Sequence, residues 1–184
     1  MSKRHKPKGK RIKPQIWVFC EGKTEQAYVA HLRSKYRVPI EIVTCVAGTG
    51  ISQQLIQRQK RGKPSHPKDM DFLLYDVDVE HILDKIQSLS GVTLLLSNPT
   101  IELWFLLHYK NQKTSISSAE CVRELSNFLH HSYKKGVLGV SMRKKLEEEC
   151  HTACSRAKEL PGFSNPSSNV YLFIESLENA KHQP

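Results

Sequence analysis

Two aspartates separated by a single residue follow a short apolar stretch near the middle of the chain. Asp76 and Asp78 come after Phe72–Tyr75, four apolar residues that are typical of a strand buried on both faces. Residues two apart in an extended chain point the same way, so both carboxylates can face one point beyond the strand. Carboxylate oxygens arranged in this way suit Mg²⁺ or Mn²⁺. The alternative is an aspartate pair that only ends a strand and begins a turn.

Two glutamates follow an earlier apolar stretch of the same kind. Glu21 comes directly after Ile16–Cys20 and precedes Gly22, and Glu25 lies at the start of the helix expected next. The carboxyl ends of parallel strands meet at one edge of a sheet, so we expect Glu21 to lie near Asp76. The helix dipole alone would favour Glu25, whereas no such local reason explains Glu21.

A third glutamate interrupts an apolar helix that is expected to begin at Pro99, with Asn98 as its cap. Glu102 is surrounded in sequence by Ile, Leu, Trp and Phe, and a glutamate in a buried helix needs a partner such as a metal ion. His108 follows about 120° round the helix. We expect His108 to be a hydrogen-bonded core histidine, with an accessory role in the site as the alternative.

A lysine beside Glu21 invites comparison with a phosphate-binding loop. Gly22, Lys23 and Thr24 match the end of a Walker motif, but the first glycine of that motif would be residue 17, which is Trp17. This excludes a Walker-type ATP site here. Lys23 is left as a candidate accessory residue of the acidic site.

The positive charge is concentrated at the N-terminus. The net charge is +10, and residues 1–13 carry seven Lys or Arg and no acid, which leaves +3 for the rest. Such an arm is expected to be disordered in isolation, and it can bind nucleic-acid phosphates or only aid solubility. The residues that we predict to bind nucleic acid are Lys3, Arg4, Lys6, Lys8, Lys10, Arg11, Lys60, Arg61 and Lys63. More distant basic residues, each more often a solvated surface, are Lys134, Lys135, Arg143–Lys145 and Arg156.

Alternating strands and helices are expected around these residues. Strands are predicted at Ile16–Cys20, Ile40–Val46, Phe72–Tyr75 and Val92–Leu96. With helices between them, this order predicts an α/β fold with a parallel sheet of about four strands flanked by helices. A helical C-terminal extension is expected, ending in a helix at Ser168–Asn179. The length fits one domain at 14–184 after a basic arm at 1–13, with a core at about 14–110 and the extension at about 115–184.

The sequence also bears on the compartment. No apolar run is long enough to span a membrane, and the basic N-terminus lacks the apolar segment of a secretory signal. The five cysteines have no framework spacing, which favours reduced thiols and a cytoplasmic protein.

Five motifs together resemble one protein family. They are CEGKTE (20–25), YDVD (75–78), SNPTIELWFLLH (97–108), ACSRA (153–157) and NPSSNV (165–170). With the alternating α/β pattern they resemble the RloB-like proteins, a Toprim-fold branch related to the OLD-type nucleases and found in bacterial restriction and abortive-infection loci. The resemblance covers nearly everything after the basic arm.

The resemblance implies a role for each acidic residue. Glu21 matches the Toprim glutamate, which acts in acid/base chemistry or metal binding, and Asp76 and Asp78 match the metal-binding aspartates. Glu25 is similar to the second acidic residue that OLD-type nucleases use, and Glu102 matches a further metal ligand more loosely. The implied cofactor is Mg²⁺ or Mn²⁺, bound as two ions, and Glu21, Asp76 and Asp78 are the implied catalytic residues.

The function implied by the resemblance is a metal-dependent nuclease that hydrolyses phosphodiester bonds as an effector of anti-phage defence. RNA such as tRNA is favoured slightly over DNA, and control by an ATPase encoded nearby is expected. The chain lacks the tyrosine motif and the appended domain of topoisomerases, so hydrolysis is favoured over strand passage. A non-catalytic nucleic-acid-binding or adaptor subunit is the alternative, and nucleotidyl transfer as in primases is a third. A homo-oligomer is left open, and no membrane partner is expected.

Overall fold

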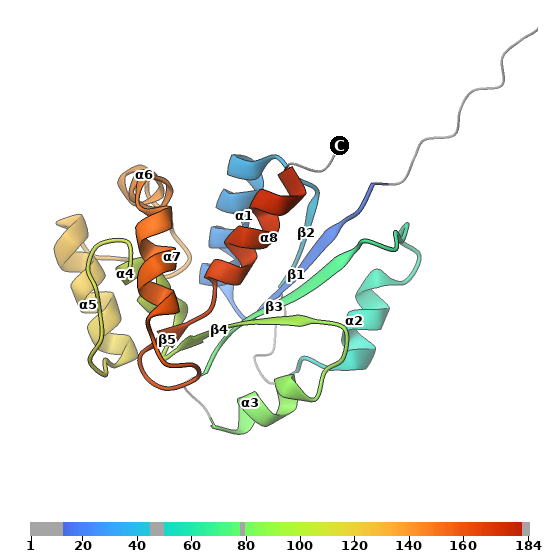
Figure 1. Ribbon diagram of the computed structural model, residues 1–184, viewed down its shortest axis with the longest axis horizontal. Helices are drawn as coiled ribbons and strands as arrows, with labels where there is room; N and C mark the ends of the chain where they lie inside the picture. Colours follow the sequence, from blue (N-terminus) through green and yellow to red (C-terminus); the bar gives the residue numbers. More distant parts are fainter. Residues whose placement is uncertain (1–12, 45–49, 78–79, 182–184) are drawn as a thin grey trace, which may run out of the picture.

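A five-stranded sheet organises the molecule in the computed structural model, which describes residues 13–44, 50–77 and 80–181 (Figure 1). The strands are β1 (Ile16–Cys20), β2 (Ile40–Thr44), β3 (Met70–Asp76), β4 (Thr93–Asn98) and β5 (Ser167–Ser168), in the order β2-β1-β3-β4-β5. The first four are parallel, and β5 is antiparallel to β4. The expected mostly parallel α/β sheet is therefore confirmed. The short polar β5 adds a strand to the four that were predicted.

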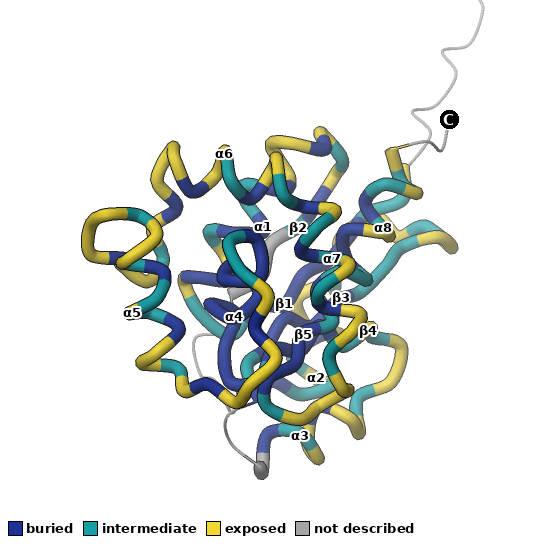
Figure 2. Tube along the Cα trace, turned by 60° about the vertical axis from the view of Figure 1, so that its left-hand side comes forward, coloured by how far each residue is buried: buried dark blue, intermediate teal, exposed yellow. Residues whose placement is uncertain are grey.

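Helices cover both faces of the sheet, as the continuously apolar strands require. The helices α1 (Lys23–Tyr36), α4 (Ile101–Leu106) and α8 (Tyr171–Lys181) contribute to one hydrophobic cluster with Val18 and Leu74. The helices α2 (Gln53–Lys60) and α3 (Glu80–Gln87) form the opposite layer, where Ile56 and Ile86 pack with Phe19 and Leu73. All five residues of β1 are buried. In Figure 2 the central strands are accordingly mostly dark blue.

The order of the strands reverses between β1 and β3. The chain leaves β1 towards β2 on one side and later adds β3 and β4 on the other. In open α/β sheets this reversal leaves a crevice outside the carboxyl ends of the two strands on either side of it. Those carboxyl ends are Cys20 and Asp76.

The C-terminal part of the chain packs beside the sheet and then returns to it. The helix α5 (Ser118–Leu129) packs against α4, and α6 (Val140–Glu148) packs against α7 (Cys150–Lys158) (Figure 1). The chain then adds β5 to the sheet, and α8 places Phe173 against Phe72 of β3, with ring centroids 4.9 Å apart. The predicted extension therefore shares one hydrophobic cluster with the strands.

The helix that carries Glu102 begins later than predicted. Thr100 is the residue before its first turn and Ile101 is its first residue, so the predicted cap at Asn98 was wrong. Asn98 instead ends β4, before a cis peptide bond to Pro99. The physical reason is that a residue before proline prefers extended backbone. The last helix likewise begins at Tyr171 and not at Ser168, which belongs to β5.

None of the helices in the described part of the chain is both long enough and apolar enough to cross a membrane.

Candidate functional site

The carboxyl edge of the sheet brings Glu21 and Asp76 together. Glu21 follows the last residue of β1, and Asp76 is the last residue of β3. The backbone N–H of Asp76 donates a hydrogen bond to Glu21 Oε2, at 2.9 Å. Neighbouring parallel strands thus place these two acids side by side, as the sequence predicted.

Asp76 joins β3 to the start of α4. Its Oδ1 accepts a hydrogen bond from the backbone N–H of Ile101 at 2.7 Å, and its Oδ2 accepts one from Thr100 Oγ1 at 2.8 Å. Burial and the nearby charges of Glu25, Glu21 and Glu102 nevertheless raise the pKa of Asp76 to about 8. Burial and the repulsion among these acids together outweigh the two donors, so Asp76 favours a proton or a cation beside it.

Glu102 and Asp76 both contact the hydroxyl group of Thr100. Its side chain is 1% exposed, Oε2 lies 2.5 Å from Thr100 Oγ1, and Oε1 accepts a hydrogen bond from Tyr133 Oη at 3.1 Å. A threonine hydroxyl has one hydrogen to donate, yet it faces an oxygen of Asp76 and an oxygen of Glu102. In the absence of a cation, one of these contacts therefore needs a proton on a carboxyl group.

Glu25 completes the acidic edge from the first turn of α1. It is buried, and burial followed by the charges of Glu102 and Glu21 raises its pKa. Backbone hydrogen bonds from Glu25 itself and from Gly22 act in the opposite direction. A Cβ atom at Gly22 would lie 3.0 Å from Glu25 Oε2, so glycine leaves the space that this carboxylate uses. We call Glu21, Glu25, Asp76 and Glu102 the acidic edge.

The segment between α5 and α6, residues 130–139, closes one side of the acidic edge. Its Tyr133 contacts Glu102, and the ammonium of Lys135 lies 3.7 Å from Glu102 Oε2. The backbone N–H of Gly136 donates to Thr24 Oγ1 at 3.0 Å, which fixes the segment to the start of α1. We predicted Lys135 only as a distant basic residue. We did not predict Thr100 or Tyr133, because nothing local in the sequence distinguishes them.

The predicted phosphate contacts in the loop after α2 lie at the opposite edge of the sheet. Lys60 donates to both carboxylate oxygens of Asp71, at 2.7 and 2.8 Å. Asp71 is near the start of β3, about 16 Å along the strand from Asp76. Arg61 and Lys63 follow Lys60 at that amino edge and so lie away from the acids. The predicted residues Lys3, Arg4, Lys6, Lys8, Lys10 and Arg11 lie outside the described residues.

The two accessory candidates differ in their position. Lys23 is the exposed first residue of α1 and lies at the acidic edge. Its side chain borders the segment at 130–139, because a Cβ atom added at Gly136 would lie 3.1 Å from the Cβ atom of Lys23. His108 is buried, with Nδ1 2.9 Å from the carbonyl oxygen of Trp104 and its ring packed edge-on against Trp104. His108 therefore fits the core histidine that we expected.

The residues of the acidic edge fit a hard divalent cation in their chemistry. They offer only carboxylate oxygens, and burial, followed by repulsion from the neighbouring acids, raises the pKa of both Asp76 and Glu25. Within residues 13–44, 50–77 and 80–181, no three acidic, histidine or cysteine side chains converge closely enough to hold an ion. The remaining predicted ligand, Asp78, lies outside those residues.

Comparison with known proteins gives one match. A family model described as RloB-like protein matches residues 16–177. The match includes every residue of the acidic edge and of the segment that closes it, and it begins after the basic arm. No curated protein and no solved structure matches the chain.

Proposed function

The chain belongs to the RloB-like family, and we propose that it is a Toprim-type, metal-dependent nuclease that hydrolyses phosphodiester bonds in nucleic acid. The observation that carries this proposal is the acidic edge at the switch point of a parallel sheet. Four carboxyl groups meet where β1 and β3 end and α1 and α4 begin, and burial, followed by repulsion among these groups, raises the pKa of Asp76 to about 8. A protein that only binds phosphates gains nothing from such a cluster beside its ligand.

In this proposal Asp76, Asp78, Glu25 and Glu102 hold Mg²⁺ or Mn²⁺, and Glu21 completes the set. When bound, two such ions would lower the pKa of a water molecule and neutralise charge on the phosphate and the leaving oxygen. Both roles belong to hydrolysis of a phosphodiester.

The chain itself contributes proton transfer and phosphate binding. Glu21 is held by the backbone N–H of Asp76, so its carboxylate is oriented to accept a proton from the attacking water. Lys23 and Lys135 stand at the same edge from two different elements, and both are exposed. In this proposal their ammonium groups contact phosphate oxygens of the substrate.

The biological setting of the proposal comes from the resemblance to Toprim and OLD-type nucleases. It comprises an effector role in anti-phage defence, control by an ATPase encoded nearby, and a slight preference for RNA such as tRNA. A non-catalytic nucleic-acid-binding or adaptor subunit is the competing function.

The test is cleavage by the purified protein with and without Mn²⁺, using total tRNA, single-stranded RNA and plasmid DNA. The control is Asp76→Asn, which keeps the shape of the side chain and removes its charge. Metal-dependent cleavage that is lost in the variant would support the nuclease and identify the polymer. Binding of nucleic acid without cleavage, both alone and with the neighbouring ATPase, would favour the adaptor.

A further inference from the structure

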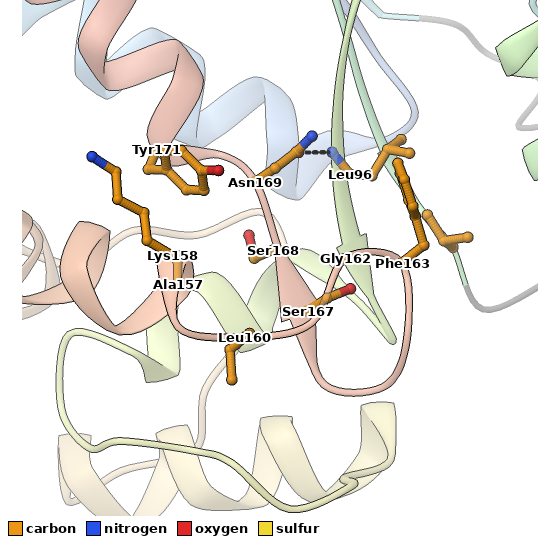
Figure 3. A pocket seen from close by; sticks show the side chains of 11 residues that line it. Leu96, Ala157, Lys158, Leu160, Gly162, Phe163, Ser167, Ser168, Asn169 and Tyr171 are labelled. Carbon is orange, nitrogen blue, oxygen red and sulfur yellow. Dashed lines mark hydrogen bonds between the residues drawn. The ribbon is translucent and has the colours of Figure 1, made fainter.

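A hollow with an exposed aromatic ring lies next to the acidic edge. It holds about 430 Å³ of space, including space open to solvent, and its walls come from β4, β5, the end of α7 and the loop that follows (Figure 3). Val77, the residue after Asp76, forms part of the wall. The backbone N–H of Val77 donates to the carbonyl oxygen of Ser97 at 2.9 Å, so the hollow is fixed relative to the acids.

The most unusual residue of the hollow is Phe163. Its side chain is 53% exposed and belongs to neither hydrophobic cluster. Its backbone has a φ of 63°, a conformation that is uncommon for a bulky residue. The side-chain amide of Asn98, at the end of β4, donates to its carbonyl oxygen at 2.9 Å. The fold therefore holds an aromatic ring at the surface, and core packing gives no reason for it.

The polar groups at the base of the hollow are already paired within the protein. Asn169 Oδ1 accepts from the backbone N–H of Leu96 at 2.6 Å, and its Nδ2 donates to the carbonyl oxygen of Leu94 at 2.9 Å. The hydroxyls of Ser97 and Ser168 lie 3.0 Å apart. These contacts make a rigid floor, and the surface left for a ligand is mainly apolar.

A cation and a second aromatic ring stand on the other side of β5 from Phe163 (Figure 3). Lys158 Nζ lies 5.2 Å from the centroid of the Tyr171 ring and 2.6 Å from Glu175 Oε1. The hollow thus combines an apolar floor, aromatic faces and an ammonium group at its rim. Stacking on aromatic rings together with attraction of phosphates is how proteins bind unpaired nucleotides.

We propose that this hollow receives the unstacked base of a nucleotide next to the cleaved phosphate, with Phe163 as the stacking residue. The inference rests on the proposed nuclease function and specifies its substrate as single-stranded or looped nucleic acid. A base inside a duplex is stacked and paired, so it cannot enter such a hollow unless it leaves the helix. The net charge of +10 and the position of Val77 directly after Asp76 favour a nucleotide over a protein segment.

The test measures affinity by fluorescence anisotropy in the Asp76→Asn background with Mn²⁺, so that binding is followed without cleavage. The probes are a labelled single-stranded RNA oligonucleotide and a duplex of the same sequence. Phe163→Ala is expected to weaken binding of the single strand about tenfold, the effect of one lost base stack, and to leave duplex binding unchanged. Phe163→Trp is expected to keep the affinity.

Two variants control for effects on the fold. Phe163→Asn removes the ring but suits the left-handed backbone, so it is expected to weaken binding as much as Phe163→Ala while keeping the melting temperature. Phe128→Ala removes the other exposed phenylalanine, which lies in α5 and stacks on Tyr109, and it is expected to leave binding unchanged.

A series of oligonucleotides with one abasic position each makes the assignment specific. In the parent protein one abasic position is expected to cost about tenfold in affinity, and in Phe163→Ala the same position is expected to cost nothing further. Equal affinity of Phe163→Ala and the parent would overturn the inference and is the result expected of a hollow that serves a protein partner. The proposed nuclease function would still be supported if the protein with Asp76 cleaves nucleic acid and the Asp76→Asn variant does not. Absence of both binding and cleavage would overturn the inference and the proposed function together.

Discussion

At the scale of single residues, the charge balance of the acidic edge depends on how few protons its carboxyl groups share. Thr100 has one hydrogen for two carboxyl oxygens, one on Asp76 and one on Glu102. Lys135 forms an ion pair with Glu102, and the side chain of Lys135 is 59% exposed. An ammonium so well solvated compensates little of the buried charge. The metal-free site is therefore short of positive charge, which predicts how it should respond to pH and to substitution.

Asp76→Asn is expected to stabilise the metal-free protein more at high pH than at low pH. The asparagine oxygen can accept from Ile101, and its NH₂ group can donate to Thr100, which then donates to Glu102. The folded-state pKa of Asp76 is raised from 3.8 to about 8. Between these values the folded protein binds more protons than the unfolded chain, so the contribution of Asp76 to stability is present below pH 3.8 and is lost as the pH rises to about 8.

Urea denaturation at about pH 5 and about pH 9 measures this effect as a difference in the free energy of unfolding. The advantage of Asp76→Asn over the wild type should grow with pH. Asp84→Asn, on the exposed side of α3, controls for the loss of one negative charge. An advantage that is the same at both pH values would contradict the raised pKa.

Lys135→Gln is expected to increase the affinity of the site for Mn²⁺ by a few fold. The substitution removes a cation 3.7 Å from Glu102 that competes with a metal ion for the same carboxylate. Isothermal titration with MnCl₂ gives the affinity directly. Lys134→Gln is the matched control, because it removes an equal charge from the adjacent exposed position. Equal Mn²⁺ affinity in the two variants would show that Lys135 does not compete at Glu102.

At the scale of elements, the site is assembled where four of them end or begin. The strands β1 and β3 end at the acids, α1 and α4 begin there, and the segment at 130–139 covers the junction. The covering segment is joined to α1 by the hydrogen bond from Gly136 to Thr24 and to α4 by the bond from Tyr133 to Glu102. The buried side chains of Tyr133 and Leu138 also join the main hydrophobic cluster, so the position of the segment depends on these two side chains and the two hydrogen bonds.

Gly136→Ala is expected to destabilise the protein by about 1–3 kcal/mol and to weaken Mn²⁺ binding. Gly136 has a φ of +78°, and a Cβ atom there would lie 3.1 Å from Lys23 Cβ. Gly62→Ala is the matched control, because Gly62 has a φ of +76° with nothing within 4 Å. The two variants share the backbone penalty, so the excess loss in Gly136→Ala measures the contact with α1.

Chemical denaturation and Mn²⁺ titration of both glycine variants test this prediction. Only Gly136→Ala should lose Mn²⁺ affinity, because only that substitution displaces Tyr133, whose hydrogen bond orients Glu102, and this loss is expected to exceed the gain from moving Lys135 away. Identical losses of stability in the two variants would mean that the segment can move without cost.

At the scale of the whole molecule, the charges are separated along the sheet. The acids lie at the carboxyl edge, whereas Lys60 and Asp71 lie at the amino edge, where β1 also begins. A nucleic acid that contacts both Lys60 and the acidic edge would have to run along the length of the sheet. The phosphate contacts predicted at Lys60, Arg61 and Lys63 therefore lie at the opposite end of the sheet from the predicted chemistry.

Removal of residues 1–12 is expected to weaken nucleic-acid binding and leave metal binding intact. These residues hold six of the Lys and Arg predicted to contact phosphates. Each lost phosphate contact lowers the slope of log affinity against log salt by about 0.7 for a single strand. Filter binding of single-stranded RNA over a range of salt concentrations gives the slope, and the Mn²⁺-dependent rise in melting temperature is the internal control. An unchanged slope would mean that the arm only aids solubility.

The sequence alone determined four of the strands, their parallel direction and the meeting of Glu21 with Asp76. Continuous apolar runs specify buried strands locally, and parallel strands bring their ends to one edge whatever the details. Only the tertiary structure decided what surrounds those acids. The bonds of Tyr133 to Glu102 and of Gly136 to Thr24 join residues 31 and 112 positions apart. The polar strand β5 is held by Asn169, whose amide bonds to Leu96, 73 positions away. Local sequence patterns specify strands, helices and turns through the spacing of apolar residues. They do not specify which distant polar groups meet when the core is packed.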